Sequence, residues 1–246
     1  MFLKLILATT LTASAETPEE IIDRARQAQS IDNAVQQIRM VMVSRSGSER
    51  TRELEMRTRR DGDVVSSYAR FSHPADVAGT QLVMVDHPNQ VDEQMLYLPA
   101  LQRVHRIAGK ARSGAFMGSD FSYEDLEVSS AASATHTLLS EDDTLWTIET
   151  IPGADSSYSR IVSHVSKSDF IPRKIEYFDQ RGDPFKLLEV LSVADDNGST
   201  IPTRSQMRNL KKGTSTILEI QEYRLNVPLD EIPEETFTAA FMERNG

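Results

Sequence analysis

The sequence predicts a mainly β protein whose strands form an antiparallel meander, with a helix near each end of the chain. Apolar and polar residues alternate with a period of two over much of the 246-residue chain, which is the pattern of half-buried strands. Turn-forming residues interrupt these stretches at short intervals, so strands that are neighbours in sequence are expected to pair. Long strands twist, and a sheet of them curls into an open or closed barrel.

The composition is that of one folded domain. Apolar residues make up 39% of the chain and charged residues 26%, which excludes a disordered protein. The absence of cysteine excludes a disulfide framework, a cysteine nucleophile and a zinc finger. The net charge of -10 argues against general nucleic-acid binding, because phosphate binding requires an excess of Lys and Arg. We expect a single domain over residues 16–246.

Residues 1–15 differ from the rest of the chain. Lys4 provides a positive charge, residues 5–11 form a short apolar run, and residues 13–15 (Ala-Ser-Ala) match the pattern before a cleavage site. These three parts predict a secretory signal peptide that is cleaved before Glu16; the alternative is a buried first strand or helix. Because no other stretch has the apolar length of a membrane helix, we expect a soluble protein in an exported compartment.

A helix is expected directly after this segment. Thr17 provides an N-cap, Pro18 suits the first helical position, and Glu20 completes a capping box. The apolar face of the helix is then formed by Ile21, Ile22, Ala25 and Ala28.

The period changes to two after Ser30, and about thirteen strands follow. On the second of them, Leu54 and Met56 share one face while charged residues take the other, so this pair is expected to face the interior. A short helix with an apolar stripe, residues 233–243, is expected near the C-terminus. The expected strands are residues 35–45, 49–60, 64–71, 81–86, 93–98, 101–107, 136–140, 144–151, 158–166, 173–179, 185–193, 203–208 and 214–225.

Residues 108–135 break the strand rhythm. Between Gly114 and Leu126 this stretch carries large apolar side chains in a loop context, namely Phe116, Met117, Phe121 and Tyr123. One interpretation is a mobile lid that closes an apolar cavity. The other is a loop pinned to the core by its aromatic residues, with Asp120 capping a helical turn.

Catalytic motifs are lacking. The sequence contains no G-x-S-x-G, H-E-x-x-H, Walker or G-x-G-x-x-G motif, and its five histidines are scattered. We therefore expect no enzyme, no cofactor and no metal site. This acidic chain contains one basic cluster, formed by Arg103, His105, Arg106, Lys110 and Arg112. The cluster could bind anionic head groups or a partner; the alternative is a solvated strand face.

Three segments, residues 71–82, 96–107 and 116–126, carry a family resemblance. Together they resemble the periplasmic outer-membrane lipoprotein-sorting proteins, in the LolA-like branch found beside RND-type lipid transporters. The resemblance implies a half-open antiparallel barrel, LolA/LolB-like, with helices on its concave side and a cavity that shields acyl chains. It also implies an arginine that latches the lid, for which Arg70 is the nearest match.

The residues are compatible with such a cavity. Strand stretches 40–43, 82–85 and 187–188 are apolar on both faces, whereas a sheet with one solvated face alternates more cleanly. Methionine side chains adapt to varied apolar ligands. We expect the lipid-binding cavity to be lined by Met40, Met42, Leu54 and Met56.

The expected function is a non-enzymatic periplasmic carrier or chaperone. It would shield lipid or lipoprotein acyl chains on their way to the outer membrane. The alternative is an adaptor subunit of an RND-type lipid exporter that binds the transporter and no lipid. The two hypotheses differ in whether lipid accompanies the purified protein.

Overall fold

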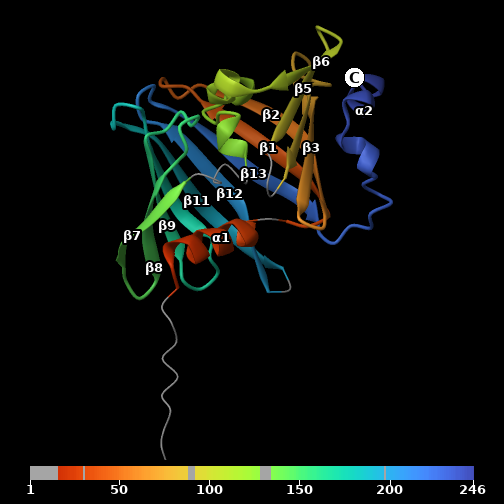
Figure 1. Cartoon of the computed structure of the whole chain (residues 1–246). Coiled ribbons are helices and arrows are strands. Elements are labelled where there is room, and N and C mark those ends of the chain that lie inside the picture. The colour runs from red at the N-terminus through yellow and green to blue at the C-terminus, as the bar shows by residue number, and fades with distance from the viewer. Residues whose placement is uncertain (1–15, 30, 88–91, 128–133, 197) are drawn as a thin grey trace, which may run out of the picture.

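The computed structural model describes residues 16–29, 31–87, 92–127, 134–196 and 198–246. The predicted signal peptide lies outside these residues. The described strands form one antiparallel sheet of 13 strands, in the order β6-β5-β4-β3-β2-β1-β13-β12-β11-β10-β9-β8-β7. The sheet curls without closing, because its edge strands β6 and β7 do not pair with each other (Figure 1). The predicted fold class, a mainly β half-open barrel, is confirmed.

The strand boundaries agree closely with the period-two pattern. They are β1 Ala34–Val43, β2 Glu49–Asp61, β3 Val64–His73, β4 Gln81–Asp86, β5 Glu93–Leu98, β6 Arg103–Ile107, β7 Thr135–Glu141, β8 Leu145–Ile151, β9 Arg160–Ser166, β10 Pro172–Phe178, β11 Pro184–Asp196, β12 Ser199–Asn209 and β13 Thr214–Arg224.

The register places one apolar set on the concave face of the sheet. Leu54 lies opposite Ile38 on β1 and Phe71 on β3, and Met56 lies opposite Ala69. Since paired residues in an antiparallel sheet project from the same face, Leu54 and Met56 both face the concave side. Their alternation with charged neighbours on β2 is therefore the signature of a sheet with two different faces.

Helix α1 (Pro18–Gln29) lies across the open side of the sheet (Figure 1). Its capping box forms as the sequence predicts: the Thr17 amide donates to the Glu20 carboxylate (2.8 Å), and the Glu20 amide donates to the Thr17 hydroxyl (3.2 Å). Its apolar face, which includes Ile21, packs on Ile148 and Val165 of the sheet. The helix thus covers one end of the concave face.

The C-terminal segment packs on the opposite, convex face. A 3-10 turn (Glu234–Phe237) and helix α2 (Ala239–Arg244) replace the single helix expected there. Thr238 separates them, because its backbone is extended (φ -114°, ψ 151°) and its hydroxyl accepts the Phe241 amide as an N-cap. Phe237 and Met242 from this segment are buried with the convex-face side chains Tyr68, Val83 and Tyr97.

Residues 109–126 link edge strand β6 toward edge strand β7 and fold into the hollow of the sheet (Figure 1). They form three 3-10 turns, Gly109–Ser113, Phe116–Gly118 and Glu124–Leu126. Asp120 caps none of them. The Ser122 amide instead donates to Asp125 (2.7 Å), which corrects the capping role expected of Asp120.

Candidate functional site

The apolar side chains of residues 113–126, here called the concave segment, are packed as core. Phe116, Phe121 and Tyr123 are 4%, 5% and 8% exposed. The Phe116 ring lies 5.8 Å from that of Phe71 and 5.7 Å from that of Tyr123. Met117 is partly buried at the edge of the same cluster. Of the two interpretations, the packing favours the one in which aromatic side chains pin this loop.

The residues predicted to line a lipid cavity lie in the same region. Met40, Met42 and Leu54 are buried in one cluster with the aromatic rings of the concave segment. Met56 is half-buried further along the concave face. The structure thus brings Met40, Met42 and Leu54 into one cluster with the predicted lid, while Met56 lies outside that cluster. None of the four lines the cavity described below.

Polar contacts also tie the concave segment to the sheet. The buried Asp120 carboxylate accepts the hydroxyls of Thr214 and Thr216 on β13, and the Asp120 amide donates to the Thr216 hydroxyl (2.9 Å). Since buried polar groups are costly without partners, these contacts fix the segment at this position.

A buried ion pair anchors the C-terminal part of the segment. Lys186 Nζ on β11 lies 2.7 Å from Asp125 Oδ2, and the two side chains are 6% and 1% exposed. The Tyr158 hydroxyl donates to the other Asp125 oxygen (2.6 Å), and Lys186 also donates to the Ser122 hydroxyl (3.3 Å). Burial, followed by the charge of Asp125, raises the pKa of Tyr158, which keeps its hydroxyl protonated as a donor.

Two further carboxylates at the end of the concave segment, Glu124 and the adjoining Glu127, are satisfied by neighbours. Glu124 accepts the hydroxyls of Ser156 and Ser157 and the Ser157 amide (3.1 Å). Glu127 forms a bidentate pair with Arg112, to which Arg112 Nε contributes at 2.7 Å. Glu127 therefore has a cationic partner, whereas Glu124 is held by neutral donors and keeps its negative charge.

Arg52, rather than Arg70, contacts the concave segment. The Arg52 guanidinium donates to the Met117 carbonyl. Arg70 is exposed on the convex face, where it borders a groove with Arg57 and Phe241. Successive side chains along β3 point to opposite faces of the sheet. Because Phe71 is buried on the concave face, the preceding residue Arg70 points to the convex face. Arg70, the predicted latch, thus points away from the concave segment, and Arg52 contacts the segment instead.

We expect Arg52→Gln to lower the free energy of unfolding by about 1–2 kcal/mol, because a charged hydrogen bond to a main-chain carbonyl is lost. Arg70→Gln, on the exposed face, should change it by less than about 0.5 kcal/mol. Denaturant unfolding measures both, and hydrogen exchange should show faster exchange around Met117 in Arg52→Gln alone. Equal effects of the two changes would show that the Arg52 contact does not hold the segment.

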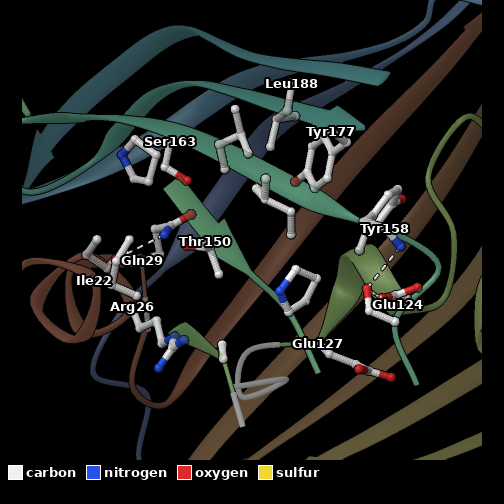
Figure 2. A pocket seen from close by; sticks show the side chains of 18 of the residues that line it. Ile22, Arg26, Gln29, Glu124, Glu127, Thr150, Tyr158, Ser163, Tyr177 and Leu188 are labelled. Carbon is white, nitrogen blue, oxygen red and sulfur yellow. Dashed lines mark hydrogen bonds between the residues drawn. The ribbon is translucent and has the colours of Figure 1, made fainter. Parts of the chain in front are cut away.

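A cavity of about 380 Å³ lies between α1, the end of the concave segment and strands β7 to β11. Figure 2 shows Leu188 and Tyr177 along one wall, with Ile22, Arg26 and Gln29 of α1 at one end and Glu124 and Tyr158 at the other. Its apolar lining comes from Ile22, Ala25, Leu126, Ala134, Pro152, Ile161, Pro172, Ile175 and Leu188, with Tyr158 and Tyr177. It is an apolar cavity with polar ends, the usual character of a small-molecule site.

The α1 end of the cavity carries a cation. Arg26 pairs with Asp23 (3.0 Å), whose side chain is 64% exposed, and burial lowers the pKa of Arg26. His136 lines the same end, with Nδ1 2.9 Å from the Thr150 hydroxyl. Burial and the charge of Arg26 lower the pKa of His136 from 6.5, so it is neutral at pH 7.

The sequence interpretation missed Lys186, Asp125 and Tyr158. One signal was present: Lys186 stands between Phe185 and the pair Leu187-Leu188, in the otherwise apolar first part of the strand. A lysine at an inward position of such a strand requires a buried partner. Nothing local in the sequence identifies that partner as Asp125, which lies 61 residues away.

Within the described residues, no group of three or more His, Asp or Glu side chains is placed to hold a metal ion. No helix in the described part of the chain combines the length and the apolar character needed to cross a bilayer.

Known proteins share this architecture. A domain from Vibrio parahaemolyticus described as outer membrane lipoprotein-sorting is 27% identical, with a TM-score of 0.81 and coverage of 92% of this chain and 97% of that one. A DUF1329 family protein from Desulfovibrio piger is 24% identical, with a TM-score of 0.81 and coverage of 90% and 96%. A LolA superfamily protein from Nitrosomonas europaea is 18% identical, with a TM-score of 0.73 and coverage of 92% and 100%. No curated protein matches the chain.

A family model described as "Uncharacterized protein" matches residues 63–244, well over half of the chain. The match begins directly before β3 and includes the concave segment, Lys186 and nearly all of the C-terminal segment. The resemblance to the LolA-like lipoprotein-sorting proteins is confirmed by the fold that the chain shares with them. The chain belongs to the family of this model, and its fold is LolA-like.

Proposed function

We propose that the protein is a periplasmic carrier that shields acyl chains of lipids or lipoproteins from water. The observation that carries the proposal is the apolar cavity on the concave face of a LolA-like sheet. Each methylene removed from water contributes about 0.8 kcal/mol, so an apolar cavity of this kind favours an acyl chain strongly. The 27% identity to a domain described as outer membrane lipoprotein-sorting supports the same role. The protein acts as a carrier and not as an enzyme.

The concave segment is the proposed lid for larger cargo. Phe116, Met117, Phe121 and Tyr123 share a cluster with Met40, Met42 and Leu54. Movement of the segment would uncover these three side chains and extend the cavity along the concave face toward Met56. Release of the Arg52 contact to Met117 would accompany that movement. The segment is firmly packed, so opening it requires cargo that replaces its apolar contacts.

The proposal is tested by the lipid content of the protein purified from its native host. Native mass spectrometry and lipid extraction should detect an acyl-chain ligand, and Ile175→Trp, which fills the cavity, should abolish its retention. Leu191→Trp is the matched control, because Leu191 is 44% exposed and does not line the cavity. An adaptor of an RND-type exporter would instead carry no lipid and bind no acyl-chain probe, which would overturn the carrier proposal.

A carrier of this kind requires export. We expect the mature protein to begin at Glu16 and to occur in the periplasmic fraction, since residues 1–15 have the three parts of a signal peptide. N-terminal sequencing of the protein from the native host decides this. Recovery of intact Met1 in the cytoplasmic fraction would contradict both the location and the carrier role.

A further inference from the structure

The charged side chains that line the cavity differ between its two ends: carboxylates lie beside the concave segment, and an arginine lies at α1. At the end next to the concave segment, Glu124 is bound by Ser156 and Ser157, and the neighbouring Asp125 is paired with Lys186. Glu127 is likewise paired with Arg112. At the α1 end stands Arg26. Glu124 is held by neutral donors and keeps its negative charge, and Arg26 is the only lysine or arginine among the described residues that line the cavity, so the two ends differ in charge.

Two carboxylates act on Arg26: Asp23, to which its guanidinium donates a hydrogen bond, and Asp86, whose charge raises its pKa. The ion pair to Asp23 joins neighbours on one face of α1, and Asp23 is 64% exposed, so this pair is weakened by solvent. The Arg26 side chain is 30% exposed and borders the cavity. A guanidinium has five N–H donors, and a bidentate bond to a carboxylate or a phosphate uses only two of them. Arg26 therefore retains donors for a second anion.

The apolar lining extends from this cation to the far end of the cavity. Figure 2 places Arg26 at one end, Leu188 and Tyr177 along the wall, and Tyr158 with Glu124 at the other end. Ile161 and Ile175 complete the apolar surface between the two ends. The volume of about 380 Å³ is near the lower end of the roughly 300–1,000 Å³ range of small-molecule pockets, which suits one chain.

We infer that the cavity binds a single-chain anionic amphiphile, with its carboxylate or phosphate at Arg26 and its acyl chain along Ile161, Ile175 and Leu188 toward Tyr177. This inference rests on the proposed carrier function and names the cargo class of the same site. His136 lies beside Arg26 and is neutral, so Arg26 alone provides the positive charge at this end. The carboxylates at the opposite end disfavour the reverse orientation.

The test compares a fatty acid with its uncharged ester. Delipidated protein is titrated at pH 8 with cis-parinaric acid, with its methyl ester, and with a single-chain lysophosphatidic acid as competitor. The acid should bind at least about 10-fold more tightly than the ester, because a charged hydrogen bond to Arg26 is made by the acid alone. Displacement by lysophosphatidic acid would show that a phosphate head group is accepted as well as a carboxylate; failure to displace would restrict the class to carboxylates.

The variant that tests the head-group contact is Arg26→Gln. It should weaken binding of the acid about 10-fold and leave binding of the ester unchanged. Arg39→Gln is the control, because Arg39 is a surface arginine on β1 that pairs with Glu219 and does not line the cavity. Thermal unfolding of both variants establishes that they are folded.

The outcomes separate the inference from the proposed function. Equal binding of acid and ester by the unaltered protein would overturn the assignment of Arg26 and leave acyl-chain carriage standing. The same conclusion follows if Arg26→Gln binds the acid normally. If neither probe binds, both the inference and the carrier function fail. The acid-to-ester ratio of the unaltered protein decides the matter even if Arg26→Gln does not fold.

Discussion

Lys186→Met is expected to lower the free energy of unfolding by about 3–5 kcal/mol, because it leaves Asp125 charged and buried without its partner. The Asp125 side chain is 1% exposed, so water cannot replace the lost ammonium group. Tyr158 would still donate to one carboxylate oxygen, which compensates only part of the charge. Denaturant unfolding of the variant and the parent protein measures the difference.

Two further variants make this result specific. Lys174→Met removes an ion pair with Glu176 in which both side chains are more than one third exposed (39% and 35%), and should cost at most about 1 kcal/mol. The double variant Lys186→Met with Asp125→Asn removes both charges and should recover part of the loss. If Lys186→Met costs no more than Lys174→Met, the buried pair does not anchor the concave segment.

Phe121→Ala is expected to lower the free energy of unfolding by about 3–5 kcal/mol, the usual cost of truncating a buried phenylalanine. Phe121 is 5% exposed and lies in one cluster with Phe71 and Met40 from the sheet. Phe121→Asp should cost still more, because it also buries a charge. A weakly held lid would show the opposite result, a small loss of stability with a clear loss of binding to an acyl-chain probe.

Thermal unfolding and probe titration of the same variants distinguish these two behaviours. Leu101→Ala is the control, since Leu101 is 52% exposed in the turn between β5 and β6 and should change stability by less than about 0.5 kcal/mol. Should Phe121→Ala behave like Leu101→Ala in unfolding while its probe affinity falls, the concave segment is a lid that is readily displaced in solution.

Much of the fold could be predicted because its signals are local. The capping box of Thr17 and Glu20 lies within one turn and forms as predicted. The shared face of Leu54 and Met56 follows from the two-residue period of a strand and from their pairing with Phe71 and Ala69. The break in the C-terminal helix at Thr238 was missed, because a threonine with helical neighbours on both sides does not by itself stop a helix.

The candidate site was predictable only in part. Phe116 and Phe121 were singled out because large apolar residues in a glycine-bounded loop must pack on something. The resemblance pointed to Arg70 through its neighbouring residue types, but the face of β3 directs Arg70 away from the concave segment, which Arg52 contacts. The cavity itself is formed by α1 and five strands from the second half of the chain, and no short motif contains it.

The sequence by itself determined the strands, the first helix and the two-faced character of the sheet, because each depends on residues within a few positions of one another. Tertiary structure alone decided that Asp125 meets Lys186, 61 residues away, and that Asp120 meets Thr216, 96 residues away. It also placed the C-terminal segment on the convex face rather than in the hollow. Such contacts depend on how a 13-stranded sheet curls, and curvature is the sum of many small twists that no single stretch of residues encodes.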